Sequence, residues 1–570
     1  MRYVLSFHPS VRMFGSHDPS AVIFRDGELV YGVEEERLTR EKHAVNTFPE
    51  QAIRACLDHC DIGLRDVDKI LLPWEPELYR QSLVSTFKEA ISGPESARTK
   101  FYQTGQAAKQ TLVSSLFSVE WIENRLEDLG SEVPPVETLS HHRCHAASAL
   151  HPAPFDDGLV LSIDGRGEYD STVVWEARNA RLERVKTYEY PNSLGTFFGV
   201  VTKFLGYYPN NGEGKVMGLA PYGERNRRIE STLRGVIDTG VEYDVTELTT
   251  GGFESGVERL EALFGRSRNK TRGEFDQWEK DLAFTAQYLL EETVTEIAET
   301  YLREFGTSNV GLAGGVALNC KMNRRVMELD AVDGIFIQPV ANDAGTAIGA
   351  GMLESGPRRT SEMTDVYWGP SFSTETIEER LETNKLDYER PDDLERAVAE
   401  RLADGDLVGW FQNRLEMGPR ALGNRSILAD PRTEASRDRV NKFVKHREEW
   451  RPFAPSMLEE AADEYLENAE PSSFMIKTFS TRPEARDDIT AVLHPSDQTT
   501  RPQTVREDQN PRYYRLISEF EDVTGVPVVL NTSFNDHGEP VVTKPNEAIK
   551  DFFGMGLDTL VLQDLIVEKR

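Results

Sequence analysis

The chain has 570 residues, of which 39% are hydrophobic and 28% charged, and its formal net charge is −31. This length exceeds what one hydrophobic core supports, so at least two domains are expected. The acidic balance argues against a nucleic-acid partner, because phosphate binding requires basic patches, and no uncharged apolar run approaches the ~18 residues of a membrane span.

The chain opens with a predicted three-stranded meander. Strands are expected at residues 2–7, 21–24 and 29–33, and an Asp-Gly pair before the third strand is a strong hairpin signal. A polar loop at residues 15–18, which contains His17, follows the first strand. Because this amino terminus lacks the apolar region of a signal peptide, the protein is expected to be cytoplasmic.

Helices are expected next, at residues 48–59 and about 95–129. Cys56 and Cys60 lie one helical turn apart, a spacing that also suits a metal clip. Because only two thiols are present there, we favour buried helix residues over a metal site. Four cysteines in a chain of this length also argue against a disulfide framework.

A second meander of the same plan is expected at residues 159–163, 171–176 and 182–188. Asp164 lies in the polar loop after its first strand. A meander with an acid-bearing loop, occurring twice, is the plan of the actin, hexokinase and Hsp-seventy class of ATPases, in which nucleotide binds between duplicated lobes. The pattern therefore predicts an α/β fold with a duplicated N-terminal domain.

Two histidines between the meanders form the sharpest local motif. His141 and His145 are four residues apart, which places two imidazoles on one helix face, an arrangement suited to a divalent metal. His142 occupies the position where a zincin peptidase needs glutamate, so peptidase chemistry is disfavoured. Asp164 and Asp343 follow predicted strands, where α/β sites collect their groups. A chance histidine pair, a turn role for Asp164 and a helix N-cap role for Asp343 remain open alternatives.

A long amphipathic helix is predicted over residues 277–305, followed by strands at 309–312 and 334–340. The loop after the first of these strands has glycines that permit close backbone approach and precedes a helix whose N-terminus favours an anion. It is not a Walker A loop, since no Gly-Lys-Ser/Thr follows. The candidate nucleotide-binding residues at these two strand ends are Gly314, Gly315, Val316, Asn319 and Asn342.

A polar stretch at residues 356–362 is a predicted linker, so we place domains at 1–360 and 365–570. In the second domain we expect a helix at 393–404, a strand at 407–411, a basic loop at 412–425 and a last strand at 526–530. Arginine forks fit phosphate, so its basic residues suggest an anion pocket, with exposed salt bridges as the alternative. These basic residues are Arg414, Arg420, Arg425, Lys445, Arg447 and Arg451. Residues 530–535 add amide and hydroxyl groups, among them Asn531 and Ser533.

Nine segments, taken together and in this order, resemble the NodU/CmcH/TobZ family of O-carbamoyltransferases over nearly the whole chain. They are residues 16–21, 33–37, 141–149, 213–220, 314–319, 342–343, 417–429, 445–455 and 530–535. Pro19 departs from the pattern, since the family more often has alanine there, and this puts substrate contacts of that loop in doubt.

The resemblance implies a duplicated actin-like (ASKHA, ribonuclease H-like) N-terminal domain and a YrdC-like α/β C-terminal domain. It implies a divalent metal, iron in that family, held by residues matching His141, His145, Asp164 and Asp343, beside ATP used with Mg²⁺. It also implies carbamoyl-phosphate binding by residues matching Arg420, Lys445, Arg451, Asn531 and Ser533. We expect Arg420 and Lys445 to be catalytic as well, with His17 orienting the acceptor or removing its proton. A purely structural role of His17 in its loop is the alternative.

The implied reaction forms carbamoyl adenylate from carbamoyl phosphate and ATP, and then transfers the carbamoyl group to a hydroxyl of a small-molecule or sugar acceptor. The alternatives are an actin-like sugar kinase, a threonylcarbamoyl-tRNA enzyme and a non-catalytic nucleotide-binding regulator. The oligomeric state stays open, a homodimer being one option. The 18 lysines against 47 arginines and 96 acidic residues also suggest adaptation to a salt-rich cytoplasm.

Overall fold

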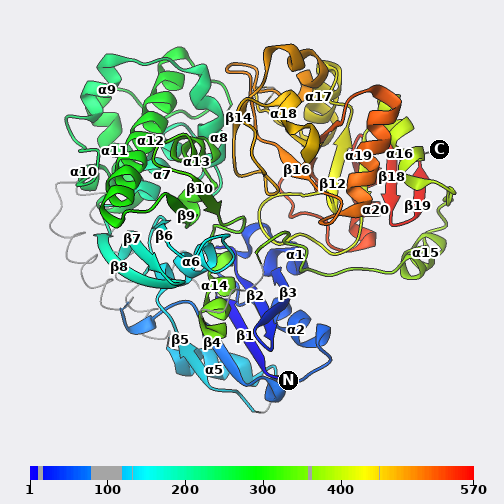
Figure 1. The fold of residues 1–570 in the computed structure, drawn as a ribbon, viewed down its shortest axis with the longest axis horizontal. Helices are drawn as coiled ribbons and strands as arrows, with labels where there is room; N and C mark the ends of the chain where they lie inside the picture. Colours follow the sequence, from blue (N-terminus) through cyan, green and yellow to red (C-terminus); the bar gives the residue numbers. More distant parts are fainter. Residues whose placement is uncertain are drawn as a thin grey trace. The chain divides into compact units, whose positions relative to one another are not determined.

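The computed structural model describes residues 1–9, 17–78, 118–130, 132–271, 273–356, 362–448 and 450–569. It consists of two compact units, Met1–Glu35 with Ala44–Met363, and Glu36–His43 with Thr364–Arg570. Each unit is mixed α/β (Figure 1). The predictions for residues 15–16, 95–117 and 357–361 fall outside the described residues. The domain limits at 360 and 365 stay predictions.

The first unit begins with a five-stranded sheet of order β3-β2-β1-β4-β5. β1 is antiparallel to β2 and β2 to β3, whereas β1, β4 and β5 run parallel. The strands are β1 (Tyr3–His8), β2 (Ser20–Arg25), β3 (Glu28–Glu34), β4 (Lys69–Leu72) and β5 (Val136–Thr138). The predicted hairpin turn is confirmed at Asp26 and Gly27, which both adopt positive φ.

A second five-stranded sheet has the order β10-β9-β6-β7-β8. β6 is antiparallel to β7 and β7 to β8, whereas β6, β9 and β10 run parallel. The two sheets therefore share one topology. The strands are β6 (Gly158–Ile163), β7 (Asp170–Arg178), β8 (Arg181–Glu189), β9 (Asn309–Ala313) and β10 (Gly334–Ile337). All six predicted meander strands are confirmed to within a few residues, whereas β10 ends three residues early, before a proline.

The long predicted helix is confirmed as α12, which runs from Gln277 to Phe305. A capping box of Asp276 and Glu279 starts it, and Gly306 in the left-handed conformation ends it. The other helices of this unit are α2 (Glu50–His59), α5 (Val119–Glu127), α6 (His141–Leu150), α7 (Leu194–Phe204), α8 (Glu213–Leu219), α9 (Arg227–Leu233), α10 (Thr246–Thr249), α11 (Gly252–Phe264), α13 (Cys320–Met327) and α14 (Ala344–Ser355).

The second unit is built on a seven-stranded sheet of order β16-β13-β17-β12-β11-β18-β19. A separate two-stranded sheet, β14-β15, comes between β13 and β16 in the sequence. The strands are β11 (Val408–Phe411), β12 (Arg425–Ala429), β13 (Ala454–Leu458), β14 (Phe479–Ser480), β15 (Thr499–Thr500), β16 (Gln503–Val505), β17 (Val528–Ser533), β18 (Thr559–Leu562) and β19 (Leu565–Glu568). The predicted strand 526–530 is therefore β17, which is longer than expected and is not the last strand. Residues 531–533 belong to it rather than to a following loop.

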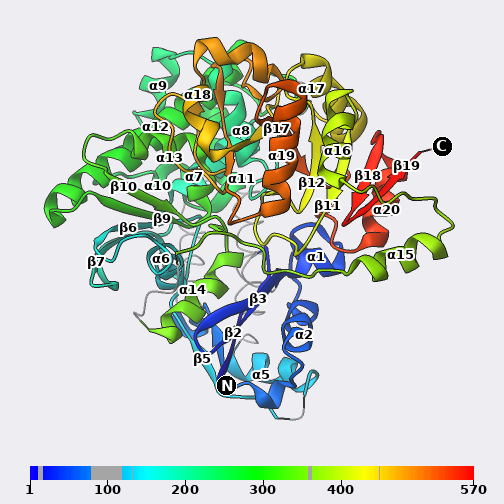
Figure 2. The same cartoon turned by 45° about the vertical axis from the view of Figure 1, so that its right-hand side comes forward.

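The helices of the second unit are α15 (Thr374–Thr383), α16 (Leu394–Ala403), α17 (Glu434–Val440), α18 (Ala462–Tyr465), α19 (Pro511–Thr524) and α20 (Pro545–Gly554). The predicted helix 393–404 is confirmed as α16, and Asp393 caps it by accepting from the Arg396 N–H. α16 packs against α19, and both lie beside the seven-stranded sheet (Figure 2).

The segment Glu36–His43 belongs to the second unit, although nothing in the composition of this segment predicted it. It contains most of α1 (Glu35–Thr39). Arg37 donates to the Gly418 carbonyl at 2.8 Å and accepts, through its own carbonyl, from the Thr543 hydroxyl at 2.7 Å. Arg40 donates to the Pro540 carbonyl at 2.8 Å.

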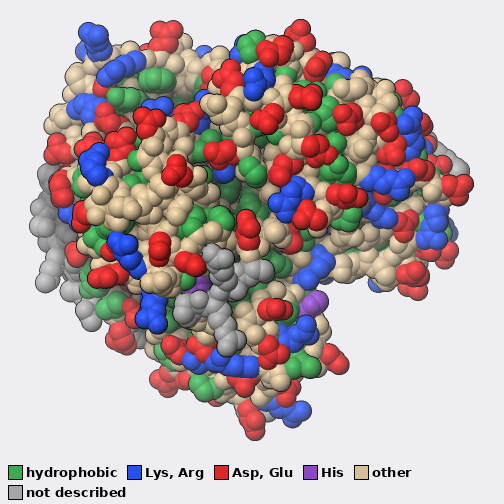
Figure 3. Space-filling model, viewed as in Figure 1, with side chains coloured by type: hydrophobic (Ala, Val, Ile, Leu, Met, Phe, Trp, Pro, Cys, Tyr) green, Lys and Arg blue, Asp and Glu red, His purple; other side chains and the backbone are tan. Residues whose placement is uncertain are grey.

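The described part of the chain has no helix that is both long and apolar enough to cross a membrane. The four cysteines are free; Cys56 is buried in α2 and Cys60 caps its end. On the face shown in Figure 3, acidic side chains are spread among basic ones rather than giving way to a basic patch.

Candidate functional site

The four residues predicted to bind a metal come together in the first unit. The Nε2 atoms of His141 and His145 are 3.1 Å apart, and Asp164 Oδ2 is 3.3 Å from the first and 3.1 Å from the second. Asp343 Oδ1 is 3.6 Å from His141 Nε2 and 3.8 Å from His145 Nε2. One ligand atom of each residue thus converges on one point, with all four atoms within 4.8 Å of each other.

Tight helix packing explains how residues so far apart in sequence meet. Asp164 follows β6, and Asp343 directly precedes α14. α14 packs on α6, which carries the histidines, and a Cβ on Gly349 would lie 1.8 Å from the Cys144 carbonyl oxygen. The small residues that the sequence places in α14 therefore let it approach the histidine helix.

The alternatives for the two aspartates resolve differently. Asp343 stands at the N-cap position of α14, but its side chain makes no capping hydrogen bond and instead faces the histidines. Asp164 does accept from the Gly165 N–H, at 2.7 Å through Oδ1, while Oδ2 faces the histidines. Asp164 is thus both a turn residue and a member of the cluster.

The electrostatics of this cluster favour a cation. Burial opposes charge on His145, but the hydrogen bonds and charges of Asp164 and Asp343 raise its pKa to about 9. Burial likewise opposes charge on Asp164, yet the two histidines hold its pKa well below the usual value. Two imidazoles and two carboxylates converging at these distances fit a divalent transition metal with nitrogen and oxygen ligands.

His142 has a structural role instead. Its Nε2 lies 3.1 Å from the Asp170 carbonyl oxygen and its Nδ1 lies 3.0 Å from Ser162 Oγ, which itself accepts from Trp175 Nε1–H at 3.0 Å. Burial, followed by the neighbouring histidines, lowers the pKa of His142 to about 3. The ring is therefore neutral and ties α6 to the sheet.

This neutral histidine predicts a pH dependence of stability. Its folded pKa of about 3 lies below its ordinary value of 6.5, so its contribution is complete above pH 6.5 and is lost as the pH falls toward 3. The free energy of unfolding then falls by up to about 1.4 kcal/mol per pH unit, because unfolding takes up one proton. We expect the unfolding temperature of His142→Asn to fall less steeply than that of the wild type between about pH 6.5 and 4. Equal slopes in calorimetric scans would contradict this.

His8, at the end of β1, is a site residue that the sequence reasoning missed. Trp74 Nε1–H donates to His8 Nδ1 at 3.2 Å, so the neutral ring carries its proton on Nε2. That atom lies 3.5 Å from Asp343 Oδ2, the oxygen turned away from the histidine pair. His8 is fully buried, and its Nε2 makes no hydrogen bond among the described residues, so it stands beside Asp343 without binding it. Its place at a strand end was the available signal.

His17 and Asn342 meet through Asp18. His17 Nδ1 lies 2.8 Å from Asp18 Oδ2, and Asn342 Nδ2 donates to the same oxygen at 2.9 Å. Burial opposes charge on His17, but Asp18 raises its pKa to about 10. A protonated ring donates hydrogen bonds, so of the two predicted roles this geometry favours orientation of a ligand over proton removal.

The predicted glycine loop borders the metal cluster. Gly314 has φ +88°, and a Cβ there would lie 2.3 Å from the Ile163 carbonyl oxygen. A Cβ on Gly315 would lie 3.0 Å from Asp164 Oδ1, and Val316 beside it is buried. Asn319 is already engaged within the protein, because it caps α13 and exchanges hydrogen bonds of 2.8 and 2.9 Å with Gln287.

In the second unit the structure brings Lys445 and Ser533 into contact. Lys445 is 7% exposed, and its Nζ donates to the carbonyl oxygens of Ser533 at 2.5 Å and Asn535 at 3.1 Å. Burial, and then the charges of Arg447, Lys42 and Arg451, hold its pKa well below the usual value. A buried amine among like charges is a setting in which an anion is favoured.

The structure relates Arg451 to this lysine through its charge, and relates Asn531 to the loop of Arg420 through a hydrogen bond. Arg451 influences Lys445 electrostatically and stands 3.7 Å from Glu448, so the predicted salt-bridge alternative is also present. Asn531 shares β17 with Ser533, two residues away, and donates to the Ala421 carbonyl at 3.1 Å. This bond places Asn531 beside the loop that carries Arg420.

Two of the predicted pocket arginines have another role. Arg425 is fully buried and donates to the carbonyl oxygens of Asn424 at 2.9 Å and Asn413 at 3.2 Å. Arg414 donates to the Gly369 carbonyl at 3.2 Å. Their hydrogen bonds give them a structural role in place of the predicted anion binding, because each guanidinium satisfies backbone carbonyls of neighbouring loops.

Comparison with known proteins identifies the family. The family model described as Carbamoyltransferase N-terminus matches residues 11–352, and the one described as Carbamoyltransferase C-terminus matches residues 399–569. The chain belongs to the carbamoyltransferase family. The predicted resemblance is therefore confirmed, as is the prediction of an enzyme that transfers carbamoyl groups.

Relatives of this carbamoyltransferase cover most of its length. Nodulation protein NolNO of Sinorhizobium fredii is 36% identical over 97% of this chain and 79% of its own. The 3′-hydroxymethylcephem-O-carbamoyltransferase of Amycolatopsis lactamdurans is 29% identical over 75% of this chain and 79% of its own. Among solved structures, component A of the Acidaminococcus fermentans (R)-2-hydroxyglutaryl-CoA dehydratase covers 62% of this chain and 97% of its own at 15% identity. The TM-score of this comparison is 0.35.

Proposed function

We propose that this enzyme uses carbamoyl phosphate and ATP to carbamoylate a hydroxyl group of a small-molecule or sugar acceptor, by way of carbamoyl adenylate. The observation that carries the proposal is that a chain with both carbamoyltransferase regions has a cation-binding cluster in one unit and a buried lysine among arginines in the other.

The second unit is proposed to start the reaction. Hydrolysis of carbamoyl phosphate gives carbamate and phosphate, and a carbamate oxygen then attacks the α-phosphorus of ATP, which releases pyrophosphate and leaves carbamoyl adenylate. Lys445, with Arg420 and Arg451, would offset the phosphate charge during these displacements. Asn531 Oδ1, which is buried and has no partner among the described residues, offers an acceptor for the carbamoyl amide.

The first unit is proposed to complete the transfer. There the acceptor hydroxyl oxygen attacks the carbamoyl carbon, its proton is released, and AMP leaves. His141, His145, Asp164 and Asp343 would hold a divalent metal, iron by family resemblance, which when bound would polarise carbonyl or phosphate oxygens. The imidazolium of His17 would orient an oxygen of the acceptor or the adenylate, and Asn342 would keep Asp18 in place beside it.

The topology of the first unit supports the nucleotide part of the proposal. Two sheets of identical strand order are what a duplicated actin-like domain contains, and its nucleotide would approach the Gly314–Gly315 turn next to Asp164. ATP would enter with Mg²⁺. The seven-stranded mixed sheet of the second unit is proposed to be YrdC-like. The net charge of −31 supports a small-molecule acceptor over a nucleic acid.

Incubation of the purified enzyme with ATP and carbamoyl phosphate tests this function. Release of pyrophosphate that requires both compounds is the expected result. ADP without pyrophosphate would indicate the sugar kinase, and absence of turnover would indicate the nucleotide-binding regulator. A screen of hydroxylated metabolites with labelled carbamoyl phosphate would then identify the acceptor, and AMP release would report each transfer.

A further inference from the structure

The loop that carries Arg420 is closed by a single carboxylate oxygen. Glu416, which is 2% exposed, stands at the start of this loop. Its Oε1 accepts backbone N–H groups from three residues at the end of the loop, Leu422 and Asn424 at 2.8 Å and Arg425 at 3.0 Å. The ten residues from 416 to 425 therefore form a closed ring, with Arg420 near its midpoint.

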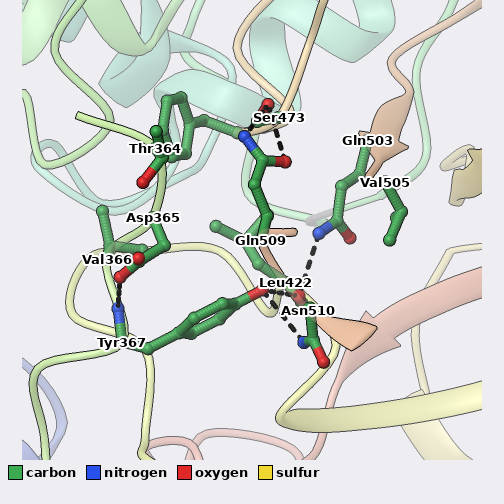
Figure 4. A pocket seen from close by; sticks show the side chains of 11 residues that line it. Thr364, Asp365, Val366, Tyr367, Leu422, Ser473, Gln503, Val505, Gln509 and Asn510 are labelled. Carbon is green, nitrogen blue, oxygen red and sulfur yellow. Dashed lines mark hydrogen bonds between the residues drawn. The ribbon is translucent and has the colours of Figure 1, made fainter. Parts of the chain in front are cut away.

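The carbonyl groups of the same loop are fixed from outside. Leu422 O accepts from the Tyr367 hydroxyl at 2.6 Å and from Gln503 Nε2 at 2.9 Å, and Asn510 Nδ2 in turn donates to that hydroxyl at 3.2 Å (Figure 4). Trp410 Nε1 donates to Gly423 O at 2.9 Å. Tyr367, Gln503 and Asn510 line a cavity of about 10 Å³, room for about one water molecule, so they serve the loop rather than a ligand.

Close packing adds a further restraint on the backbone. Gly423 has φ +99°, a left-handed conformation, and a Cβ there would lie 2.3 Å from a ring carbon of Tyr513. Near the start of the loop, the Gly418 carbonyl accepts from the Arg37 guanidinium at 2.8 Å. Both halves of the loop are thus held on either side of Arg420.

We propose that Glu416 is a positioning residue that holds the Arg420 guanidinium in place for the phosphate of carbamoyl phosphate. The inference rests on the proposed function of the second unit. A carboxylate suits this task because one charged oxygen binds three N–H groups more strongly than a neutral amide oxygen can. Holding the loop before the substrate arrives removes an ordering cost that binding would otherwise bear.

A double-mutant cycle measured by calorimetric binding of carbamoyl phosphate tests this role. Glu416→Gln keeps the shape but removes the charge, and we expect it to raise the Kd about tenfold. In an Arg420→Ala background the same change should alter the Kd less than about twofold, because the group that Glu416 acts through is gone. Glu416→Asp, which keeps the charge but shortens the reach, serves if the glutamine variant does not fold.

Glu395→Gln is the matched control. Glu395 is also a buried carboxylate of the second unit, 7% exposed, but it pairs with the Arg512 guanidinium at 3.3 Å rather than with backbone N–H groups of the loop. Its replacement should lower the unfolding temperature without changing the Kd. If Glu416→Gln raises the Kd equally in both backgrounds, Glu416 has only a structural role. That result would overturn this inference and leave the proposed function standing. If the wild type does not bind carbamoyl phosphate, the proposed function fails and the inference falls with it.

Discussion

Replacing His145 with alanine is expected to remove the divalent metal from the enzyme and to abolish transfer to the acceptor. The reason is geometric: His145 Nε2 is one of the four converging ligand atoms, 3.1 Å from both His141 Nε2 and Asp164 Oδ2. Removal of a residue that hydrogen-bonds a metal ligand typically lowers metal affinity about 10–100-fold, and removal of a ligand itself should lower it further. Metal content after purification, and affinity for added Fe²⁺ in a competition titration, measure the effect.

The control for this variant is His59→Ala. His59 is an exposed histidine at the end of α2, stacked on Tyr31, and its loss should leave metal content unchanged. Carbamoyl-phosphate binding should survive in His145→Ala, because Lys445 and its neighbours belong to the other unit. Full metal content in His145→Ala would show that the four-residue cluster is not the metal site.

Replacing Lys445 with alanine should have the opposite pattern. Its Nζ donates to Ser533 Oγ at 3.3 Å, and the pKa of Lys445 is held well below the usual value by burial and then by neighbouring positive charges. Binding of a phosphate dianion would relieve that repulsion. Removal of the Lys445 amine should therefore lower carbamoyl-phosphate-dependent pyrophosphate release about 10²–10³-fold. The metal content should stay that of the wild type.

Lys442→Ala provides the comparison, since Lys442 lies on the same turn but is exposed over Phe443. It should retain activity. Lys445→Arg, which keeps the charge but cannot reproduce all four contacts of the amine with Ser533 and Asn535, should recover only part of it. Wild-type pyrophosphate release in Lys445→Ala would remove the lysine from the proposed mechanism.

The pattern of hydrophobic residues predicted part of the first unit, but not β4, β5 or the helices α7 to α11. Both meanders and α12 were predictable because periodicity and turn residues are local properties of the chain. The second unit was less predictable: all its strands except β11 and β17 were missed, since short buried strands lack a distinct periodicity. The end of β17 was read as a loop, because Asn531 and Ser533 are polar, although their backbone pairs with β12.

The sequence by itself determined the chemical inventory of this enzyme: a histidine pair at helical spacing, acids at strand ends, a glycine turn and a set of basic residues in the second unit. Only the tertiary structure decided which of them act together. His8 at the end of β1 lies 3.5 Å from Asp343 at the start of α14, far away in the chain, while Arg414 and Arg425 donate to backbone carbonyls. The physical reason is that a buried polar group takes whichever partner packing places beside it, and no local pattern records that choice.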